Sequence, residues 1–265
     1  MKIGFIGIGN MGQAIALNLV KINDYQIFAT AKNQDKLESF AKQNNMTALK
    51  TNQELVEQSD VVILAVKPNL IETVLKEIQP TLTNQKIIVS LAAGITIEQI
   101  EKMISTDSPI IRVMPNIAAS VGESATAIVG NNNASEQQFQ TVTDIFENCG
   151  EVYPIDEKDF PAFISLAGSS PAIMFILIDA LSRAGVKHGI TKEQATKIAT
   201  QAMLGSAELL KETNENPWNL VDKVSSPGGT TVAGVLALKE AGFEDAVTKA
   251  VDAIIERDQE ISDKK

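Results

Sequence analysis

The sequence KIGFIGIGNMGQAIALNLVK, residues 2–21, decides the fold of the first part of this chain. Its first residues predict a strand, and its last residues carry apolar side chains at helical spacing. Between them, Gly7, Gly9 and Gly12 form the pattern G-x-G-x-x-G. A strand, this turn and a helix in direct succession are typical of the first unit of a dinucleotide-binding fold. The alternative is a glycine-rich turn that binds nothing.

Each glycine has a separate role in such a turn. The first allows the tight bend, the second lets the backbone approach a pyrophosphate, and the third permits close packing of the helix on the strand. We therefore predict that a dinucleotide contacts the whole turn, namely Gly7, Ile8, Gly9, Asn10, Met11 and Gly12.

The end of the second predicted strand indicates which dinucleotide binds. NAD sites place an acidic residue about 20 residues after the glycine turn, at the ribose 2′-hydroxyl. This chain has Thr30, Lys32 and Asn33 there, and the first acid is Asp35. A hydroxyl, an amide and a cation suit a 2′-phosphate better, so we predict NADPH, with NADH possible. The alternative is that Thr30 and Asn33 only cap the next helix.

Strand and helix patterns alternate through the first 160 residues, which predicts a doubly wound, mainly parallel sheet in a Rossmann-type α/β domain. The run VVILAV is apolar almost throughout, as expected of a strand buried on both faces. We expect strands over 2–9, 25–30, 61–66, 86–92, 110–114 and 125–130, and helices over 11–21, 33–43, 69–82 and 96–104.

From residue 161 the pattern is helical only. We expect helices over 169–185, 191–213, 231–242 and 243–261, the first with Ser170 as N-cap and Pro171 at the first helical position. The prediction is a dinucleotide-binding domain over 1–160 and an all-α domain over 161–265.

Two buried strands are followed by similar motifs. AVKPN, residues 65–69, and RVMPN, residues 112–116, lie where ligands bind in open α/β sheets. We place Ala65, Val66, Lys67 and Pro68 at the cofactor on this ground. The alternative is that each proline ends a strand and that Lys67 is solvated.

Composition excludes several classes of function. The chain of 265 residues has a net charge of −10 and 5% aromatic residues, which argues against nucleic-acid binding. Its single histidine, His188, argues against a zinc site and a Ser-His-Asp triad, and its single cysteine, Cys149, excludes an internal disulfide. The start reads as a strand rather than a signal peptide, and the apolar run 172–178 is too short to span a bilayer. We expect a cytoplasmic protein without a membrane or metal partner.

A second group of small residues lies about 220 residues after the first. SSPGGTT, residues 225–231, precedes an apolar helical pattern. Backbone N–H groups at such a turn bind anions without a lysine or arginine. The equally supported alternative is an ordinary helix start capped by Thr230 or Thr231.

Six motifs together resemble one enzyme family. FIGIGNMG, AVKP, AAG, RVMPN, GSSPA and SSPGGTT, in this order and spacing, resemble pyrroline-5-carboxylate reductase over essentially the whole chain. The resemblance implies NAD(P)H-dependent reduction of the C=N bond of 1-pyrroline-5-carboxylate to L-proline, the last step of proline biosynthesis. It also implies a Rossmann domain, a helical dimerisation domain and an active site between protomers. The chain departs at Ile173, where the family often has tyrosine, and at Ser225, where some relatives have cysteine.

The resemblance also implies roles for individual residues. The substrate carboxylate would bind at Ser226, Gly228, Gly229, Thr230 and Thr231, with both glycines at positive φ, and the Thr231 hydroxyl would contact the ring nitrogen as the catalytic group. A threonine is a poor acid, so it orients the ring or relays a proton. We add Asn52 and Ala93 to the cofactor-binding residues.

Two other functions stay open at this point. A β-hydroxyacid dehydrogenase-like NADP oxidoreductase would use a lysine of the second domain, but Lys187, Lys192 and Lys197 lie in no such motif. A non-enzymatic NADPH-binding sensor would need no substrate turn. Because the helix at 172–178 is apolar nearly all round, we expect at least a homodimer, and a higher homo-oligomer is compatible with the same pattern.

Overall fold

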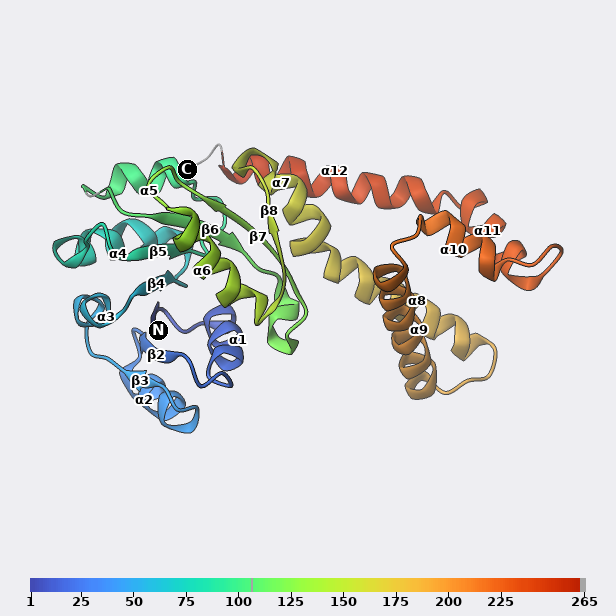
Figure 1. Ribbon diagram of the computed structural model, residues 1–265. Helices are drawn as coiled ribbons and strands as arrows, with labels where there is room; N and C mark the ends of the chain where they lie inside the picture. Colours follow the sequence, from blue (N-terminus) through green and yellow to red (C-terminus); the bar gives the residue numbers. More distant parts are fainter. Residues whose placement is uncertain (106, 263–265) are drawn as a thin grey trace. The chain divides into compact units, whose positions relative to one another are not determined.

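The computed structural model describes residues 1–105 and 107–262, which form two compact units (Figure 1). The first, called the sheet unit, is formed by the described residues of Met1–Gly168 together with residues 255–262. The second, called the helical unit, is Ser169–Ile254. Within the part of the chain described, every strand belongs to the sheet unit.

The sheet has eight strands in the order β3-β2-β1-β4-β5-β6-β7-β8. All neighbours are parallel except β6 and β7, so the predicted doubly wound, mainly parallel sheet is confirmed. The chain builds one half of the sheet outward from β1 and then returns to build the other half from β4. The strands are β1 (Lys2–Ile6), β2 (Gln26–Thr30), β3 (Thr47–Ala48), β4 (Val61–Leu64), β5 (Ile87–Ser90), β6 (Ile110–Met114), β7 (Ser124–Gly130) and β8 (Gly150–Pro154).

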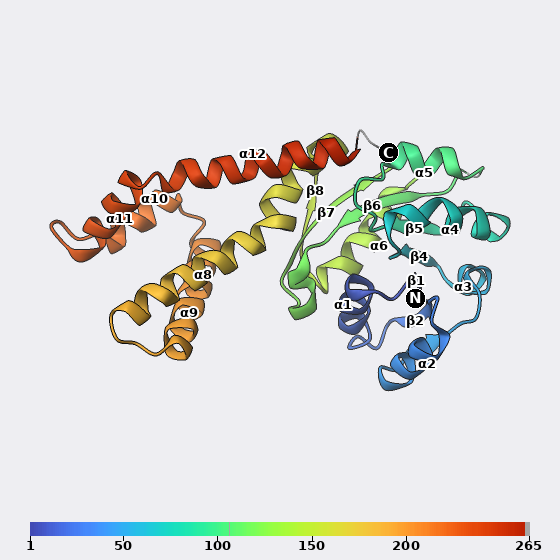
Figure 2. The ribbon, with the colours of Figure 1, turned by 180° about the vertical axis from the view of Figure 1, so that it is seen from behind.

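Helices cover both faces of this sheet (Figures 1 and 2). Strand β4 shows why its sequence is continuously apolar: Val61 and Ile63 belong to one buried cluster, and Val62 and Leu64 to the other. On the first face lie α1 (Asn10–Leu19), α2 (Gln34–Gln43) and α6 (Glu136–Glu147), and on the second α3 (Asn52–Gln58), α4 (Ile71–Ile78) and α5 (Ile97–Met103).

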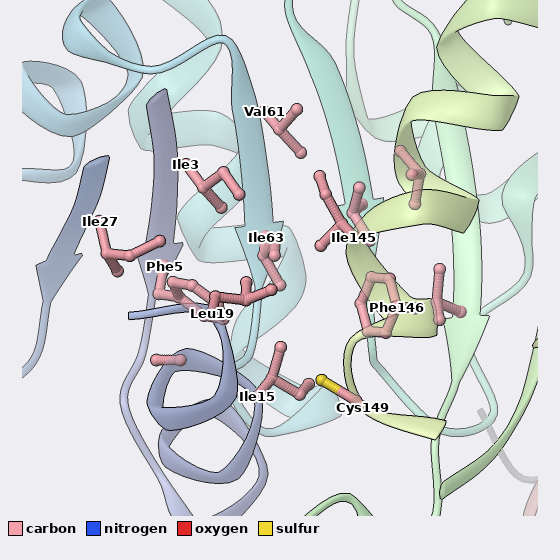
Figure 3. Close-up of a cluster of buried hydrophobic side chains, with 14 of the residues drawn as sticks. Ile3, Phe5, Ile15, Leu19, Ile27, Val61, Ile63, Ile145, Phe146 and Cys149 are labelled. Carbon is pink, nitrogen blue, oxygen red and sulfur yellow. The ribbon is translucent and has the colours of Figure 1, made fainter. Parts of the chain in front are cut away.

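Figure 3 shows the first cluster, where Ile15 of α1 lies close to Cys149. The Cys149 side chain is fully buried, and this burial raises the pKa of its thiol to about 11. The thiol is therefore protonated at neutral pH and serves the packing of the core.

Besides the four-residue helix Phe160–Phe163, two strands and three α-helices were not predicted. Strand β3 has two residues, and β8 is an edge strand with mostly exposed side chains, so neither has an apolar pattern. Helix α6 does carry a signal, because Ser135 and Gln138 form a capping box. Helix α3 begins after Thr51, which accepts from the Glu54 backbone. The third is α10 (Pro217–Val224).

The start of the first long helix differs from the prediction. Ser170 is not an N-cap, because α7 (Phe160–Phe163) continues through a π-helical segment (Ile164–Ser169) into α8 (Ser170–Lys187). Pro171 has no N–H to donate to the carbonyl of Ala167. That carbonyl accepts a hydrogen bond from Asn116 Nδ2 at 3.0 Å. The helix therefore passes Pro171 instead of starting there.

Because these helical segments are continuous, the apolar helix is longer than the run 172–178, which by itself is too short to span a bilayer. The segment Glu157–Lys187 has 31 residues and is long and apolar enough to cross a membrane by length and composition alone. The expectation that residues 172–178 are too short considered only part of this helix.

The helical unit also contains α9 (Lys192–Thr213), α11 (Thr230–Glu240) and most of α12 (Phe243–Ser262). Helices α8 and α9 lie side by side in both views of the ribbon (Figures 1 and 2). Their contact uses small and polar groups: a Cβ on Gly185 would lie 3.0 Å from Cβ of Ala195, and the Ser182 and Thr196 hydroxyls are 2.6 Å apart. Helix α9 begins after Thr191, the start of the predicted helix, whose side chain accepts from the Gln194 backbone.

Candidate active site

The predicted cofactor residues gather at one edge of the sheet. They follow β1, β2, β3, β4 and β5, which are five adjacent parallel strands whose carboxyl ends meet there. The strand order reverses between β1 and β4, and this switch point is where open α/β sheets bind ligands. The residues at this edge are Gly7 to Gly12, Thr30, Lys32, Asn52, Ala65 to Pro68 and Ala93.

The glycine turn after β1 packs against the end of β4. Gly7 has φ +92, and a Cβ there would lie 2.8 Å from a Val66 methyl group. A Cβ on Gly12 would lie 2.9 Å from the Gly7 carbonyl oxygen and 3.2 Å from Cβ of Ala65. These two glycines are thus required by backbone conformation and by packing. Ala65 and Val66 complete the turn from the neighbouring strand.

Gly9 is different, because it is exposed and a Cβ there would meet no atom within 4 Å. Gly9 is the N-cap of α1, and no side chain caps this helix. The N–H groups of the first turn of α1 and the positive end of its dipole therefore face an open surface. These features fit a dinucleotide pyrophosphate.

At the end of β2, three side chains are linked by two consecutive hydrogen bonds. The Thr30 hydroxyl donates to Asn52 Oδ1 at 2.6 Å, and Asn52 Nδ2 donates to Glu77 Oε2 at 2.8 Å. Thr30 is only 5% exposed, whereas Lys32 is exposed. Asn33, not Thr30, caps α2, accepting from the Lys36 backbone at 2.9 Å. The idea that Thr30 only caps the next helix is therefore wrong.

The loops after β4 and β5 are shaped by short turns. Lys67 is exposed and precedes the 3-10 helix Pro68–Leu70, with Pro68 at its first position. Strand β4 already ends at Leu64, so Pro68 begins the 3-10 helix and does not itself end the strand. Ala93 is exposed and precedes Gly94, which has φ +66. The contacts of these residues with a cofactor stay predictions.

The motif RVMPN has mainly a structural role. Arg112 is 5% exposed, its Nη1 lies 2.8 Å from Glu157 Oε1, and its guanidinium stacks 4.4 Å from the Phe160 ring centre. Glu157 Oε1 also accepts from the Ile97 backbone at 2.9 Å, at the start of α5. This partly buried ion pair joins β6, α5 and the 3-10 helix Glu157–Asp159 that precedes α7. The sequence interpretation missed Glu157 and Glu77, since each stands in an ordinary helical stretch.

In the helical unit, the sequence SSPGGTT forms a tight turn before α11. The Gly229 N–H donates to the Ser226 carbonyl at 2.9 Å, and Gly228 between them has φ +69. Pro followed by a glycine at positive φ is typical of a type II turn. Gly229 itself has φ −78, so the expectation of positive φ at this glycine is wrong. Its lack of a side chain matters for space, because a Cβ would lie 2.5 Å from Ser226 Oγ.

Helix α11 has no side-chain cap. Its N-cap is Gly229, and Thr230 and Thr231 are its first two residues. The alternative that either threonine caps this helix is therefore wrong. Both threonines are exposed, as are Ser226 and Gly228. The turn thus presents hydroxyl groups beside the uncapped N-terminus of an 11-residue helix, a combination that fits a carboxylate.

The other polar candidates of the helical unit are engaged elsewhere. Lys192 Nζ lies 2.7 Å from Asp179 Oδ1, and Lys197 Nζ lies 2.6 Å from Glu193 Oε1. Hydrogen bonds from Lys192 and Arg183 hold the pKa of Asp179 below its usual value. His188 is the exposed C-cap of α8. In the described residues no group of three or more His, Cys, Asp or Glu is placed to hold a metal ion.

Comparison with known proteins decides the family. Pyrroline-5-carboxylate reductase from Aquifex aeolicus is 42% identical over 253 residues, 95% of this chain and 94% of that protein. The chain belongs to the pyrroline-5-carboxylate reductase family. The model for pyrroline-5-carboxylate reductase dimerisation matches residues 157–261 of this family member, and the model for NADP oxidoreductase, coenzyme F420-dependent, matches residues 2–94.

Solved structures of the family agree. The 1-pyrroline-5-carboxylate reductase of Streptococcus pyogenes has a TM-score of 0.87 at 38% identity, covering 98% of each chain. The pyrroline carboxylate reductase of Plasmodium falciparum, solved with NADP bound, has a TM-score of 0.87 at 31% identity, covering 99% of this reductase-family chain and 98% of its own. The resemblance inferred from six motifs is thereby confirmed.

The open surface at Gly9 leads to a prediction. Gly9→Val should weaken NADPH binding at least about tenfold, because its side chain occupies the space in front of the α1 N-terminus. The free energy of unfolding should change by less than about 1 kcal/mol, because a Cβ there meets no neighbour. Fluorescence titration and urea unfolding measure the two quantities. In the control Gly12→Val, the unfolding free energy should fall by about 1–3 kcal/mol. Equal NADPH affinity in Gly9→Val and wild type would contradict the assignment.

Proposed function

We propose that this protein reduces the C=N bond of 1-pyrroline-5-carboxylate to L-proline with NADPH, as the last step of proline biosynthesis in the cytoplasm. The observation that carries the proposal is the uncapped SSPGGTT turn of α11 in a chain whose family relatives are named for this reaction. The proposed division is a NADP(H)-binding domain over 1–160 and a dimerisation and substrate domain over 161–265.

The proposed cofactor site is the carboxyl edge of β1 to β5. The N-terminus of α1 holds the pyrophosphate, and the end of β2, without a carboxylate of its own, accepts the 2′-phosphate near Lys32 and Asn52. The Plasmodium relative with NADP bound supports this choice. NADH lacks only the 2′-phosphate and is the expected weaker alternative.

The proposed substrate site is the turn before α11. The substrate is a small ring with a carboxylate, which binds to the backbone N–H groups at the N-terminus of α11 and to the Ser226 and Thr230 hydroxyls. Gly229 keeps Ser226 close to the turn, where any larger residue would push it away. Binding by N–H groups suits a chain with a net charge of −10, because no cation has to be buried.

Thr231 is the proposed catalytic group. When bound, the reduced nicotinamide supplies the hydride that adds to the imine carbon, C2 of 1-pyrroline-5-carboxylate. The Thr231 hydroxyl contacts the ring nitrogen, orients the ring and relays a proton from water to that nitrogen. A threonine does not ionise near neutral pH, so acceleration relies mainly on holding the ring in reactive geometry.

A substrate panel tests the reaction directly. NADPH oxidation, followed by absorbance, should require pyrroline-5-carboxylate and yield L-proline in equal amount. β-Hydroxyacids, with NADP as oxidant, should give no turnover, because Lys192 and Lys197 are paired in surface ion pairs. NADPH binding without turnover on any imine would contradict the proposal and favour a sensor.

The role of Thr231 leads to a mutational prediction. Thr231→Ala should lower kcat about 100- to 1000-fold, the usual effect of losing one hydrogen-bond donor at a reacting atom. The Kd for NADPH should stay within about twofold, and Thr231→Ser should recover most of the activity because it keeps the hydroxyl. Thr230→Ala, the neighbouring control, should mainly raise KM. A kcat unchanged in Thr231→Ala would show that its hydroxyl is not used.

The exposed surface of the helical unit supports a homodimer. Of its residues, only Ser182, Ala195 and Ala199 are buried within one chain. Phe175 is 62% exposed, Ile176 69% and Leu236 60%. Single chains rarely leave so many large apolar side chains in water, and a second copy around a two-fold axis covers them economically. We therefore propose an obligate homodimer through residues 161–265, and assembly beyond the dimer is compatible with it.

A charge in this surface tests the dimer. Phe175→Glu should abolish the soluble dimer and the activity together, because a buried unpaired carboxylate is costly in an apolar interface. Lys187→Glu introduces the same residue at a polar position of the same helix and should leave both intact. Sedimentation velocity and the NADPH assay provide the measurements. A fully active monomer of Phe175→Glu would contradict the proposal.

A further inference from the structure

A carboxylate lies behind the end of β2 although the sequence places no acid there. Asn52 begins α3, and its amide is held from both sides: Oδ1 accepts from Thr30, and Nδ2 donates to Glu77. The two hydrogen bonds, 2.6 and 2.8 Å long, fix which way the amide points. Glu77 belongs to α4, 47 positions after Thr30 in the sequence.

Glu77 is well placed for this contact. Its side chain is only partly exposed, and its backbone carbonyl accepts from Gln53 Nε2 at 3.0 Å. Two neighbouring residues of α3 therefore bind Glu77, one at its side chain and one at its backbone. No lysine or arginine pairs with the Glu77 carboxylate among the ion pairs of the described residues. Among the described side chains, the Asn52 amide is the group that donates a hydrogen bond to this carboxylate.

The position of this charge bears on the cofactor. In NAD sites, the carboxylate at the end of the second strand accepts from the ribose 2′-hydroxyl and repels a 2′-phosphate. Here the carboxylate comes from helix α4, and the Asn52 amide lies between it and the Thr30 hydroxyl. The carboxylate does not itself bond to Thr30, but only two hydrogen bonds and one amide group separate it from the Thr30 hydroxyl, which is within the range over which charges interact.

We propose that Glu77 is a positioning and specificity-determining residue of the cofactor site. It holds the Asn52 amide in one orientation, and its negative charge lowers the affinity for the 2′-phosphate of NADPH relative to NADH. The preference for NADPH is thus smaller than the end of β2 alone would produce. The inference rests on the proposed function only in that both dinucleotides bind at this edge.

Direct binding measurements test the charge. NADPH and NADH are titrated by fluorescence without any imine substrate, at low and at high salt. Glu77→Gln keeps a side-chain oxygen for Asn52 Nδ2 and removes the charge. It should tighten NADPH binding about three- to tenfold at low salt, with NADH changed less than about twofold, and the gain should shrink at high salt. Glu72→Gln, on the same helix but paired with Lys76, is the matched control and should change neither.

A second variant separates orientation from charge. Glu77→Ala removes both the charge and the acceptor, so the Asn52 amide is no longer held. Both cofactors should bind more weakly than to Glu77→Gln, while the NADPH-to-NADH affinity ratio stays above that of wild type. Thermal unfolding of every variant with and without cofactor shows whether the fold is intact. If Glu77→Gln does not fold, the NADPH-to-NADH affinity ratio of Glu77→Ala, compared with that of wild type, tests the effect of the charge.

Two outcomes overturn the inference. If the affinity ratio is the same in wild type, Glu77→Gln and Glu72→Gln, Glu77 has only a structural role, and the proposed function is untouched. If wild type binds neither dinucleotide, the cofactor site itself is wrong and the proposed function falls with it. An equal gain in Glu72→Gln would show a general effect of net charge and would also overturn the inference.

Discussion

The sheet unit depends on the close contact between the glycine turn after β1 and the end of β4. Gly7 bends the chain at positive φ, and Gly12 brings α1 against both the turn and Ala65. Any side chain at these two positions would separate strand and helix. Because β1 and β4 are the central pair from which both halves of the sheet grow, this contact also sets the switch point where the strand ends open. The edge that binds a dinucleotide is thus a consequence of how the core is packed.

Although the chain is acidic, it offers backbone N–H groups as binding sites for anions. At both α1 and α11 a glycine is the N-cap and no side chain occupies the helix end. The N–H groups there remain available to a phosphate or a carboxylate, and the helix dipole favours both. Cations are used differently: Arg112 is buried against Glu157 and Phe160, where it joins structural elements and is not exposed to a ligand. Charged side chains near the cofactor, such as Glu77, then adjust selectivity more than they provide affinity.

The helical unit has the opposite character to the sheet unit. The sheet unit buries large apolar side chains in two clusters, whereas the helical unit buries three small residues in a single chain. Its helices touch through alanine, glycine and hydroxyl groups, which allow close contact but bury little apolar area. The long segment Glu157–Lys187 is apolar enough to cross a membrane by composition, yet it lies in the part of the chain that matches the family's dimerisation model. A second copy is the partner that this match supports.

The sequence by itself determined the alternating fold, the family and the two glycine-containing turns, because these depend on local features. Glycine spacing, the apolar run at Val61–Leu64 and the capping box at Thr96 are readable within a few residues. Only the tertiary structure decided the rest. Helix α8 passes Pro171 because Asn116, 55 positions earlier, binds the carbonyl that proline leaves free. Gly229 is needed for space near Ser226 and not for its φ angle, and Glu77 reaches Asn52 from another helix. These contacts join residues far apart in the chain or depend on exact backbone geometry. Neither produces a residue pattern that can be recognised in the sequence.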